Sequence, residues 1–531
     1  MSNEKDPIIL TNYAKVSKLL ISTAVLLTLI YFTWWLNINN AGHPVLYTFL
    51  VVGEIFHVWQ ALGYAYTIYN QKRIPFKMAK YYHPVDIYIT VCGEPVEVVE
   101  KTVRAVMDIS YPYFNAYVLN DSKGAGKDNW EDIDIMAERY GAVPISRPTN
   151  KGFKAGNVNN AMRLTKAPYI AIFDADQIPE KNFLIRTMGY FNDEKMALVQ
   201  TPQYYVNKGD NFLTRAAWEQ QELFFGPICN GKNKSNATFW CGTNAIIKRK
   251  AIESIGGVPE DNIAEDFLAS LFLHEQGWST IYIPEILAKG LAPHNLGDYV
   301  NQQFRWARGS LEVIFKYNPL FRRGLSWAQK MQYLYSSGYY LNGIIVLIDA
   351  AIPLLALGFD ALPVSAETSD FMVYFFPFIF STIFLLMMST RNQITFNAIQ
   401  MSMSSFFVFF TATISAALNI KVKFKVTSKS KESGNYLKLV IPHMIYIVLT
   451  IIAIVVAVIR DGIVPSVVTN ASWAIFNIIF FSGFLRVAYP WETVFEKLTK
   501  PVTLGLEQEV AEEFAFPFVE IDTSLHTDHE D

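Results

Sequence analysis

The chain has 531 residues, of which 51% are hydrophobic and 15% aromatic, and its formal net charge is −3. This length suits several domains, and the near balance of charge excludes the basic surface typical of nucleic-acid binding. The charge is unevenly placed, because nine acidic residues and no Lys or Arg occur from Glu507 onward. That composition predicts a mobile acidic tail.

The three cysteines are Cys92, Cys229 and Cys241, and none of them forms a CxxC pair. Their number is odd, which does not fit a framework of paired disulfides. We therefore predict reduced thiols that face the cytosol.

Six apolar stretches are long enough to cross a bilayer, which requires about 20 residues. They cover residues 17–37, 45–69, 335–358, 371–390, 437–459 and 471–489. The first is too long for the apolar region of a signal peptide and has no small-residue cleavage site, so we predict a membrane anchor.

A seventh stretch, at 394–418, is aromatic but also rich in Ser, Thr and Asn. If it crossed the membrane, the basic cluster at 421–431 would be external, against the positive-inside rule. We therefore predict that it lies in the membrane interface, with both termini and the 70–330 segment in the cytoplasm. The predicted parts are a tail with two spans (1–80), a cytoplasmic domain (81–320), a second membrane region (321–500) and an acidic cytoplasmic tail (501–531).

The cytoplasmic segment alternates predicted strands and helices. Apolar runs predict strands at 85–91, 117–121, 142–146 and 169–173, and helices are expected at 98–107 and 157–164. This alternation indicates an α/β domain with a mostly parallel sheet. Ligands of such sheets bind at the carboxyl ends of the strands, which is where Glu94, Asp121, Asp174 and Asp176 fall.

Asp174 and Asp176 flank a single residue at the end of a predicted strand. In an extended chain, residues i and i+2 point to the same side, so both carboxylates could face one ion. Hard oxygen ligands suit Mg²⁺ or Mn²⁺, which commonly also binds substrate phosphates. The alternative is a pair of turn acids, which are common at strand ends.

Two further motifs sit at predicted helix starts. Lys154 and Gly156 precede a helix, where phosphate is favoured, although this motif by itself favours a surface lysine before a helix cap. Glu265 and Asp266 open the helix predicted at 267–276. Asp266 is either a first-turn acid or a general base, which the helix start would keep ionised.

The stretch at 302–306, with sequence QQFRW, separates the carboxylate-rich part from the later membrane segments. On a helix, Gln302, Arg305 and Trp306 share one face. The arginine suits a diphosphate and the indole suits the apolar face of a sugar; the alternative is an amphipathic helix lying on the membrane. Phe239 and Trp240, in the sequence FWCG, either bind a sugar or belong to the core.

These motifs occur in the order D, DxD, ED and QxxRW, together with KAGN at 154–157, FWCG at 239–242 and FKVTSK at 424–429. From about residue 45 to 490, the chain therefore resembles processive inverting family 2 glycosyltransferases of the bacterial cellulose synthase, curdlan synthase and mixed-linkage glucan synthase type. The resemblance implies a GT-A catalytic domain inserted in a helical membrane domain of about six spans, located in the plasma membrane. It further implies a gating loop at 421–435.

The resemblance also implies roles for individual residues, with Asp266 as the catalytic base. The nucleotide sugar would be bound by Thr90, Glu94, Asp121, Lys154, Asp174, Gln302 and Arg305. The acceptor would be bound by Phe239, Trp240, Cys241 and Trp306, and the gating loop would act through Phe424, Thr427 and Lys429. Asp174 and Asp176 would ligate Mg²⁺ or Mn²⁺.

The implied reaction polymerises glucose from UDP-glucose into a β-glucan and exports the growing chain across the lipid bilayer, with no nucleic-acid partner and with room for accessory export or regulatory subunits. Departures from the family pattern at Ala264, Trp240 and Cys92 leave β-1,4, β-1,3 and mixed linkages open. The alternatives are a hyaluronan- or chitin-type synthase with an N-acetylhexosamine donor, a non-processive lipid-linked sugar transferase, and a transporter with a cytoplasmic domain.

Three ionisable residues lie inside predicted membrane segments: Glu54, His57 and Asp349. Such residues are expensive in lipid and commonly mark a polar pathway. Packing between helices with a paired polar group is the alternative expectation.

Overall fold

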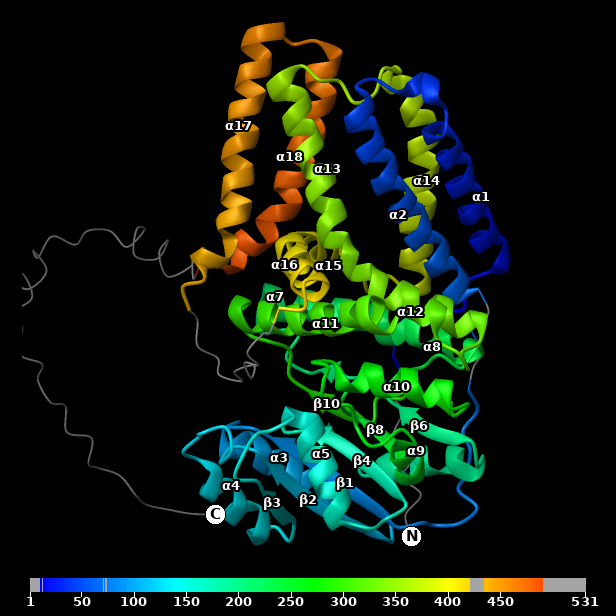
Figure 1. Cartoon of the computed structure of the whole chain (residues 1–531), viewed down its shortest axis with the longest axis vertical. Helices are drawn as coiled ribbons and strands as arrows, with labels where there is room; N and C mark the ends of the chain where they lie inside the picture. The colour runs from blue at the N-terminus through cyan, green and yellow to red at the C-terminus, as the bar shows by residue number, and fades with distance from the viewer. Residues whose placement is uncertain (1–9, 12, 70, 72–73, 421–433, 490–531) are drawn as a thin grey trace, which may run out of the picture. The chain divides into compact units, whose positions relative to one another are not determined.

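The computed structural model describes residues 10–11, 13–69, 71, 74–420 and 434–489. Within these residues, an α/β domain occupies one end and a set of long helices the other (Figure 1). The predicted gating-loop residues Phe424, Thr427 and Lys429 lie outside the described residues, as does the acidic tail.

The α/β domain is built on a seven-stranded sheet with strand order β3-β2-β1-β4-β8-β6-β9. Its strands are β1 (Val85–Val91), β2 (Phe114–Asn120), β3 (Val143–Ser146), β4 (Tyr169–Asp174), β6 (Met196–Gln200), β8 (Ala245–Lys248) and β9 (Ser279–Tyr282). The first four strands are mutually parallel, while β8 runs antiparallel to β4 and β6. The predicted mostly parallel sheet is confirmed. A second, three-stranded sheet contains β5 (Ile178–Pro179), β10 (Ala288–Gly290) and β7 (Tyr204–Tyr205).

Helices cover both faces of the large sheet, so its central strand β1 is buried at every position. Ile87 and Ile89 pack on one face with α3 (Val96–Met107) and α4 (Trp130–Arg139). Tyr88 points to the other face, toward a cluster that includes residues of α5 (Phe153–Leu164), α9 (Arg249–Ser254) and α10 (Glu265–Glu275). Burial on two faces explains why this strand is rich in apolar residues.

Within the described residues, six helices are long and apolar enough to cross a membrane, which confirms the six predicted segments. They are α1 (Lys18–Trp35), α2 (Pro44–Ile68), α13 (Asn342–Phe359), which continues from α12 (Trp327–Gly338), α14 (Thr368–Ser389), α17 (Ile441–Asp461) and α18 (Pro465–Val487). Their connecting turns lie at the end away from the sheet (Figure 1). A bridge between Ala41 and Val364 and a hydrogen bond of 3.1 Å between Thr368 and Thr469 join these turns.

Shorter helices separate the long helices from the sheet. Figure 1 shows α15 (Phe396–Ser404) and α16 (Phe406–Ala417) nearly end-on, so they run across the long helices rather than along them. The two are bent by 43° relative to each other, and they pack on α7 (Phe212–Leu223) and α11 (Leu296–Tyr317). The interfacial position of 394–418 stays a prediction, because a pair of helices with this bend also fits a broken span.

Two local predictions are wrong in detail. Helix α5 begins at Phe153, so Lys154 lies within its first turn rather than before it. Strand β4 ends at Asp174 and Asp176 lies in the following turn, so the extended geometry assumed for the two acids does not hold.

Candidate functional site

The carboxyl end of β2 places Asp121 against a basic partner that the sequence patterns did not reveal. Arg147 forms a two-pronged ion pair with it, with Nε and Nη2 at 2.7 and 2.6 Å from the two carboxylate oxygens. Burial raises the pKa of Asp121, and Arg147 opposes that rise. Nη1 and Nη2 of Arg147 also donate to the carbonyls of Lys151 and Phe153. Arg147 therefore ties the Asp121 loop to the start of α5.

Asp174 lies at the end of β4, which is separated by β1 from β2, the strand that precedes Asp121. Its carboxylate accepts hydrogen bonds from two predicted site residues. Thr90 Oγ1 donates to its carboxylate at 3.0 Å, and Lys154 Nζ forms an ion pair with it. Lys154 also donates to the carbonyl of Gly242 at 2.9 Å. Burial lowers the pKa of Lys154, but Asp174, Glu265 and Asp266 together raise it. The ammonium group is therefore held charged among acidic groups.

Glu94 is placed at the same edge but faces its own turn. Its Oε2 accepts from the backbone N–H of Cys92 at 2.6 Å, and its carbonyl accepts from Asn129 at 2.8 Å. These bonds shape the turn after β1.

Asp266 lies in the first turn of α10, as predicted, and its Oδ1 accepts from the N–H of Phe267 at 2.8 Å. Burial raises its pKa, the negative charge of Glu265 raises it further, and Lys154 and the helix-start N–H groups oppose the rise. The expectation that the helix start alone keeps Asp266 ionised is therefore wrong, because burial outweighs it. A carboxylate with a raised pKa is a better proton acceptor when it is ionised.

The predicted face of α11 is present, since Gln302, Arg305 and Trp306 all lie within one continuous helix. Gly309 approaches Ala264 so closely that no side chain fits between them, which fixes α11 against the start of α10. Burial lowers the pKa of Arg305, and the charges of Asp174, Glu265 and Asp266 oppose that effect. Arg305 therefore belongs to the same charged cluster as Lys154.

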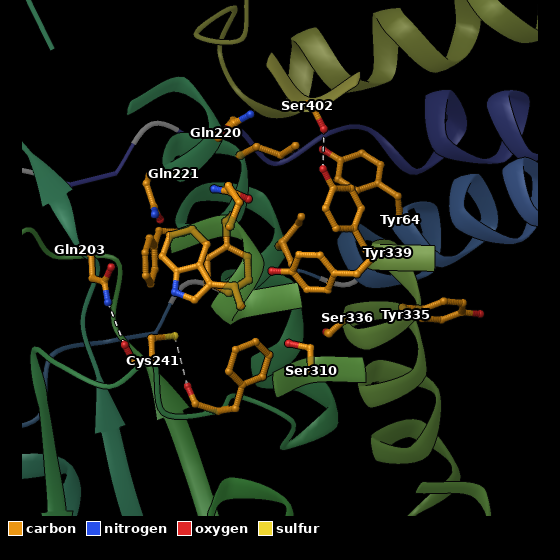
Figure 2. Close-up of a pocket in the computed structure, with 18 of the residues that line it drawn as sticks. Tyr64, Gln203, Gln220, Gln221, Cys241, Ser310, Tyr335, Ser336, Tyr339 and Ser402 are labelled. Atoms are coloured by element: carbon orange, nitrogen blue, oxygen red, sulfur yellow. Dashed lines mark hydrogen bonds between the residues drawn. The ribbon is translucent and has the colours of Figure 1, made fainter. Parts of the chain in front are cut away.

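A cavity of about 430 Å³ begins at these residues and extends to the long helices (Figure 2). Asp266, Gln302 and Trp306 line it on the α/β side, whereas Tyr64 of α2 and Ser402 of α15 line it on the other. A volume of this size is typical of a ligand pocket. The site thus connects a buried carboxylate directly to the membrane-spanning part.

The FWCG stretch borders the cavity, and its tryptophan also packs in the core. Phe239, Trp240 and Cys241 line the cavity, and the carbonyl of Cys241 accepts from Gln203 at 2.8 Å (Figure 2). Trp240 is only 1% exposed and packs in the core beneath the sheet face. Its ring also borders the cavity, so the predicted acceptor contact of Trp240 stays a prediction.

Metal binding depends on few protein ligands here. Asp176 is buried, and its Oδ2 accepts from the N–H of Leu291 at 3.2 Å. Within the part of the chain that the structure describes, no group of three or more His, Cys, Asp or Glu side chains is arranged to hold a metal. Asp174 and Asp176 fit a divalent ion only if substrate phosphates complete its coordination, as Mg²⁺ commonly requires.

Several cavity residues carried no signal in the sequence. Lys232 is 2% exposed, and Nζ donates to Ser336 at 2.7 Å and to Gln332 at 3.0 Å. Burial lowers the pKa of this lysine to about 8. Tyr339 and Tyr340 line the cavity from the turn before α13. The adjacent pair of tyrosines near the start of a predicted membrane segment was the one sequence feature that could have indicated them.

Two of the three ionisable residues of the membrane segments, His57 and Asp349, pair with each other, which fits both expectations. His57 Nε2 and Asp349 Oδ2 lie 2.9 Å apart. Glu54 forms a side-chain hydrogen bond with Tyr31 of α1.

Residues 83–309 match the family described as "Glycosyltransferase like family 2", and this match, the sheet and the acids at its carboxyl edge together define a GT-A-type domain. Residues 253–497 match the family described as "Cellulose synthase", so the resemblance stated from the motifs is confirmed.

Curated relatives agree with these matches. The UDP-forming cellulose synthase 1 catalytic subunit of Komagataeibacter xylinus is 33% identical over 376 residues, which cover 68% of this chain and 50% of the relative. The UDP-forming cellulose synthase catalytic subunit of Pseudomonas fluorescens (strain SBW25) is 29% identical over 450 residues, covering 80% and 60%. Cellulose synthase 2 of Novacetimonas hansenii is 34% identical over 307 residues, covering 56% and 19%. The chain therefore spans about three fifths or less of these relatives.

Proposed function

We propose that this protein is a membrane-embedded, inverting and processive β-glucan synthase that polymerises glucose from UDP-glucose and exports the product. The observation that carries the proposal is the cavity that joins Asp266 and Trp306 to the long helices. A soluble product would not require a catalytic carboxylate at the mouth of a membrane-spanning helix set. The UDP-forming relatives support a UDP-sugar as donor.

In this proposal, the charged cluster holds the donor and the leaving diphosphate. Lys154 and Arg305 lie among the acids, and their positive charge would stabilise the negative charge that develops as UDP departs. Asp174 and Asp176 would hold Mg²⁺ or Mn²⁺, which supplies further stabilisation of the diphosphate when bound. Asp121 would be kept in place for the nucleotide by Arg147.

Asp266 would accept the proton of the acceptor hydroxyl as that oxygen attacks the anomeric carbon. The bond to UDP breaks in the same displacement, so the configuration inverts and an α-linked donor gives a β-linked product. Trp306 and Gln302 line the cavity beside Asp266 and would hold the acceptor sugar there. The gating-loop roles of Phe424, Thr427 and Lys429 are part of the proposal and concern residues outside the described ranges.

We propose the plasma membrane as the location, with the α/β domain in the cytoplasm, where nucleotide sugars are available. The test is to offer the purified protein UDP-glucose, UDP-N-acetylglucosamine and UDP-glucuronate and to measure UDP release and polymer. Digestion with linkage-specific glucanases then separates β-1,4, β-1,3 and mixed products. Polymer formed only from an N-acetylhexosamine donor would replace the glucan assignment, and the absence of UDP release from every donor would contradict the enzymatic proposal.

A further inference from the structure

One face of α2 carries polar side chains through the membrane-spanning part. His57, Gln60, Tyr64 and Thr67 recur at intervals of three or four residues and therefore share a helix face. We refer to these four residues as the polar stripe of α2. Gln60, Tyr64 and Thr67 line the cavity that begins at Asp266, so the stripe continues the wall of the catalytic cavity into the long helices.

The stripe ends at the ion pair between His57 and Asp349 of α13. Gly53 makes this pairing feasible, because a Cβ there would lie 2.8 Å from Oδ1 of Asp349. His57 is about one helical turn beyond Gln60, since each residue rises about 1.5 Å. At ten or more residues from either end of α2, His57 lies well inside the span.

The ion pair is not sealed between the two helices. The side chains of His57 and Asp349 are 36% and 32% exposed, respectively. A charged pair that faced hydrocarbon over a third of its surface would be costly, so such residues face the interior of the helix set or a polar path. The carboxylate of Glu54, about one helical turn from His57, is a charged neighbour of the pair, and the open side of the pair faces the interior of the helix set or a polar path.

The opposite side of the α2–α13 contact has the character of a lipid-facing surface. Val52, Ile55 and Trp59 of α2 form an apolar groove there with Ile344 of α13. These residues occupy a different face of α2 from the polar stripe, as their numbering along the helix requires. The two faces thus distinguish the side of α2 that meets lipid from the side that meets the extended cavity.

One buried hydrogen-bond donor of the polar stripe has no acceptor among the described residues. The Nε2 atom of Gln60 is buried and makes no hydrogen bond to any residue within the described ranges. Buried amide donors in native proteins are nearly always paired. A ligand with many hydroxyl groups that moved along the stripe would supply the missing acceptor.

We propose that His57 and Asp349 form a carbohydrate-binding site on the exit path of the nascent polymer, a site that rests on the proposed function. The carboxylate accepts hydrogen bonds from sugar hydroxyls, and the ring nitrogens of the imidazole donate hydrogen bonds to sugar hydroxyls or accept them. The ligand class is a neutral β-linked hexose chain, whose hydroxyls replace water around the pair as the chain passes. Gln60 and Tyr64 carry the chain between this site and Trp306.

The first test measures which face of α2 is hydrated. His57→Cys and the matched Ile55→Cys are reconstituted in proteoliposomes and treated with a membrane-impermeant thiol reagent, with the unaltered protein reporting the background of its three cysteines. We expect labelling at position 57 at least fivefold above that at position 55. Equal or absent labelling at position 57 overturns the proposal. This readout requires no synthesis, so it stands even if the donor or linkage assignment fails.

The second test measures the polymer. The apolar pair His57→Leu/Asp349→Leu should shorten the product at least fivefold, whereas the neutral polar pair His57→Asn/Asp349→Asn should retain at least half of the original length. Ile55→Ala, on the apolar face, is the control for helix packing. Unchanged length in the apolar pair, or equal shortening in both pairs, overturns the proposal. Failure of the unaltered protein to make any polymer would instead contradict the proposed function.

Discussion

Gly242 lies directly against the carboxylate of Asp266. A Cβ at position 242 would be 3.0 Å from Oδ2 of Asp266 and 3.6 Å from Nζ of Lys154. Gly242 also has φ of +82°, a conformation that favours glycine. The glycine of the FWCG stretch therefore leaves room for the Asp266 carboxylate and the Lys154 ammonium group beside it.

Gly242→Ala should reduce turnover at least tenfold, because the methyl group displaces Asp266 or Lys154 and the backbone conformation costs about 1 kcal/mol. Gly256, which also has a positive φ but open space around it, provides the control. Gly256→Ala carries the same backbone cost without a clash in the site. Similar turnover in the two variants would show that the crowding at Gly242 does not matter to catalysis.

Asp266→Asn should lower the rate of UDP release about 10²-fold or more, the loss typical of a removed general base. The amide keeps the size of the side chain but cannot accept the proton of the acceptor hydroxyl. Binding of UDP, measured by calorimetry, should remain within about threefold, because the diphosphate contacts are assigned to other residues. Near-normal synthesis by this variant would rule Asp266 out as the base.

The pH dependence follows from the burial of Asp266. A base must be deprotonated, so kcat/KM should fall as the pH drops through the raised pKa of Asp266. Glu265→Gln removes a negative charge that contributes to that rise, and it should move the acid limb to lower pH. A pH profile measured on both proteins checks this, and an unmoved or oppositely moved limb would contradict the assignment of the limb to Asp266.

Divalent metal should be essential for turnover. EDTA should stop UDP release, because it removes the ion that the two carboxylates and the substrate phosphates would bind together. Mg²⁺ or Mn²⁺ should restore UDP release. Asp176→Asn should raise the metal concentration needed for half-maximal activity at least tenfold. Turnover that continues undiminished in chelator would exclude the Asp174–Asp176 metal site.

Much of the fold could be predicted because its signals are local. The run at 85–91 is rich in apolar residues, β1 is buried at every position, and the predicted bounds match the strand. The six spans follow from length and composition alone. The order of Asp121, Asp174 and Asp266 along the chain also indicated a common site.

The remaining features depend on contacts between distant segments, which single-sequence patterns do not contain. Arg147 meets Asp121 across 26 positions, and His57 meets Asp349 across 292. The burial of Trp240 depends on core side chains of distant segments, and its ring borders the cavity together with Phe239. The raised pKa of Asp266 likewise arises from tertiary burial that opposes its local helix-start position.

The two tryptophans of the predicted acceptor site should behave differently. Trp306 lines the cavity on α11, so Trp306→Ala should reduce polymer formation at least tenfold through loss of the stacking surface. Trp240 is enclosed in the core, so Trp240→Ala should cost about 3–5 kcal/mol of stability. Thermal unfolding in detergent and polymer yield, measured on both variants, separate the effects. If Trp306→Ala destabilised the fold as much as Trp240→Ala did, Trp306 would be a packing residue rather than an acceptor platform.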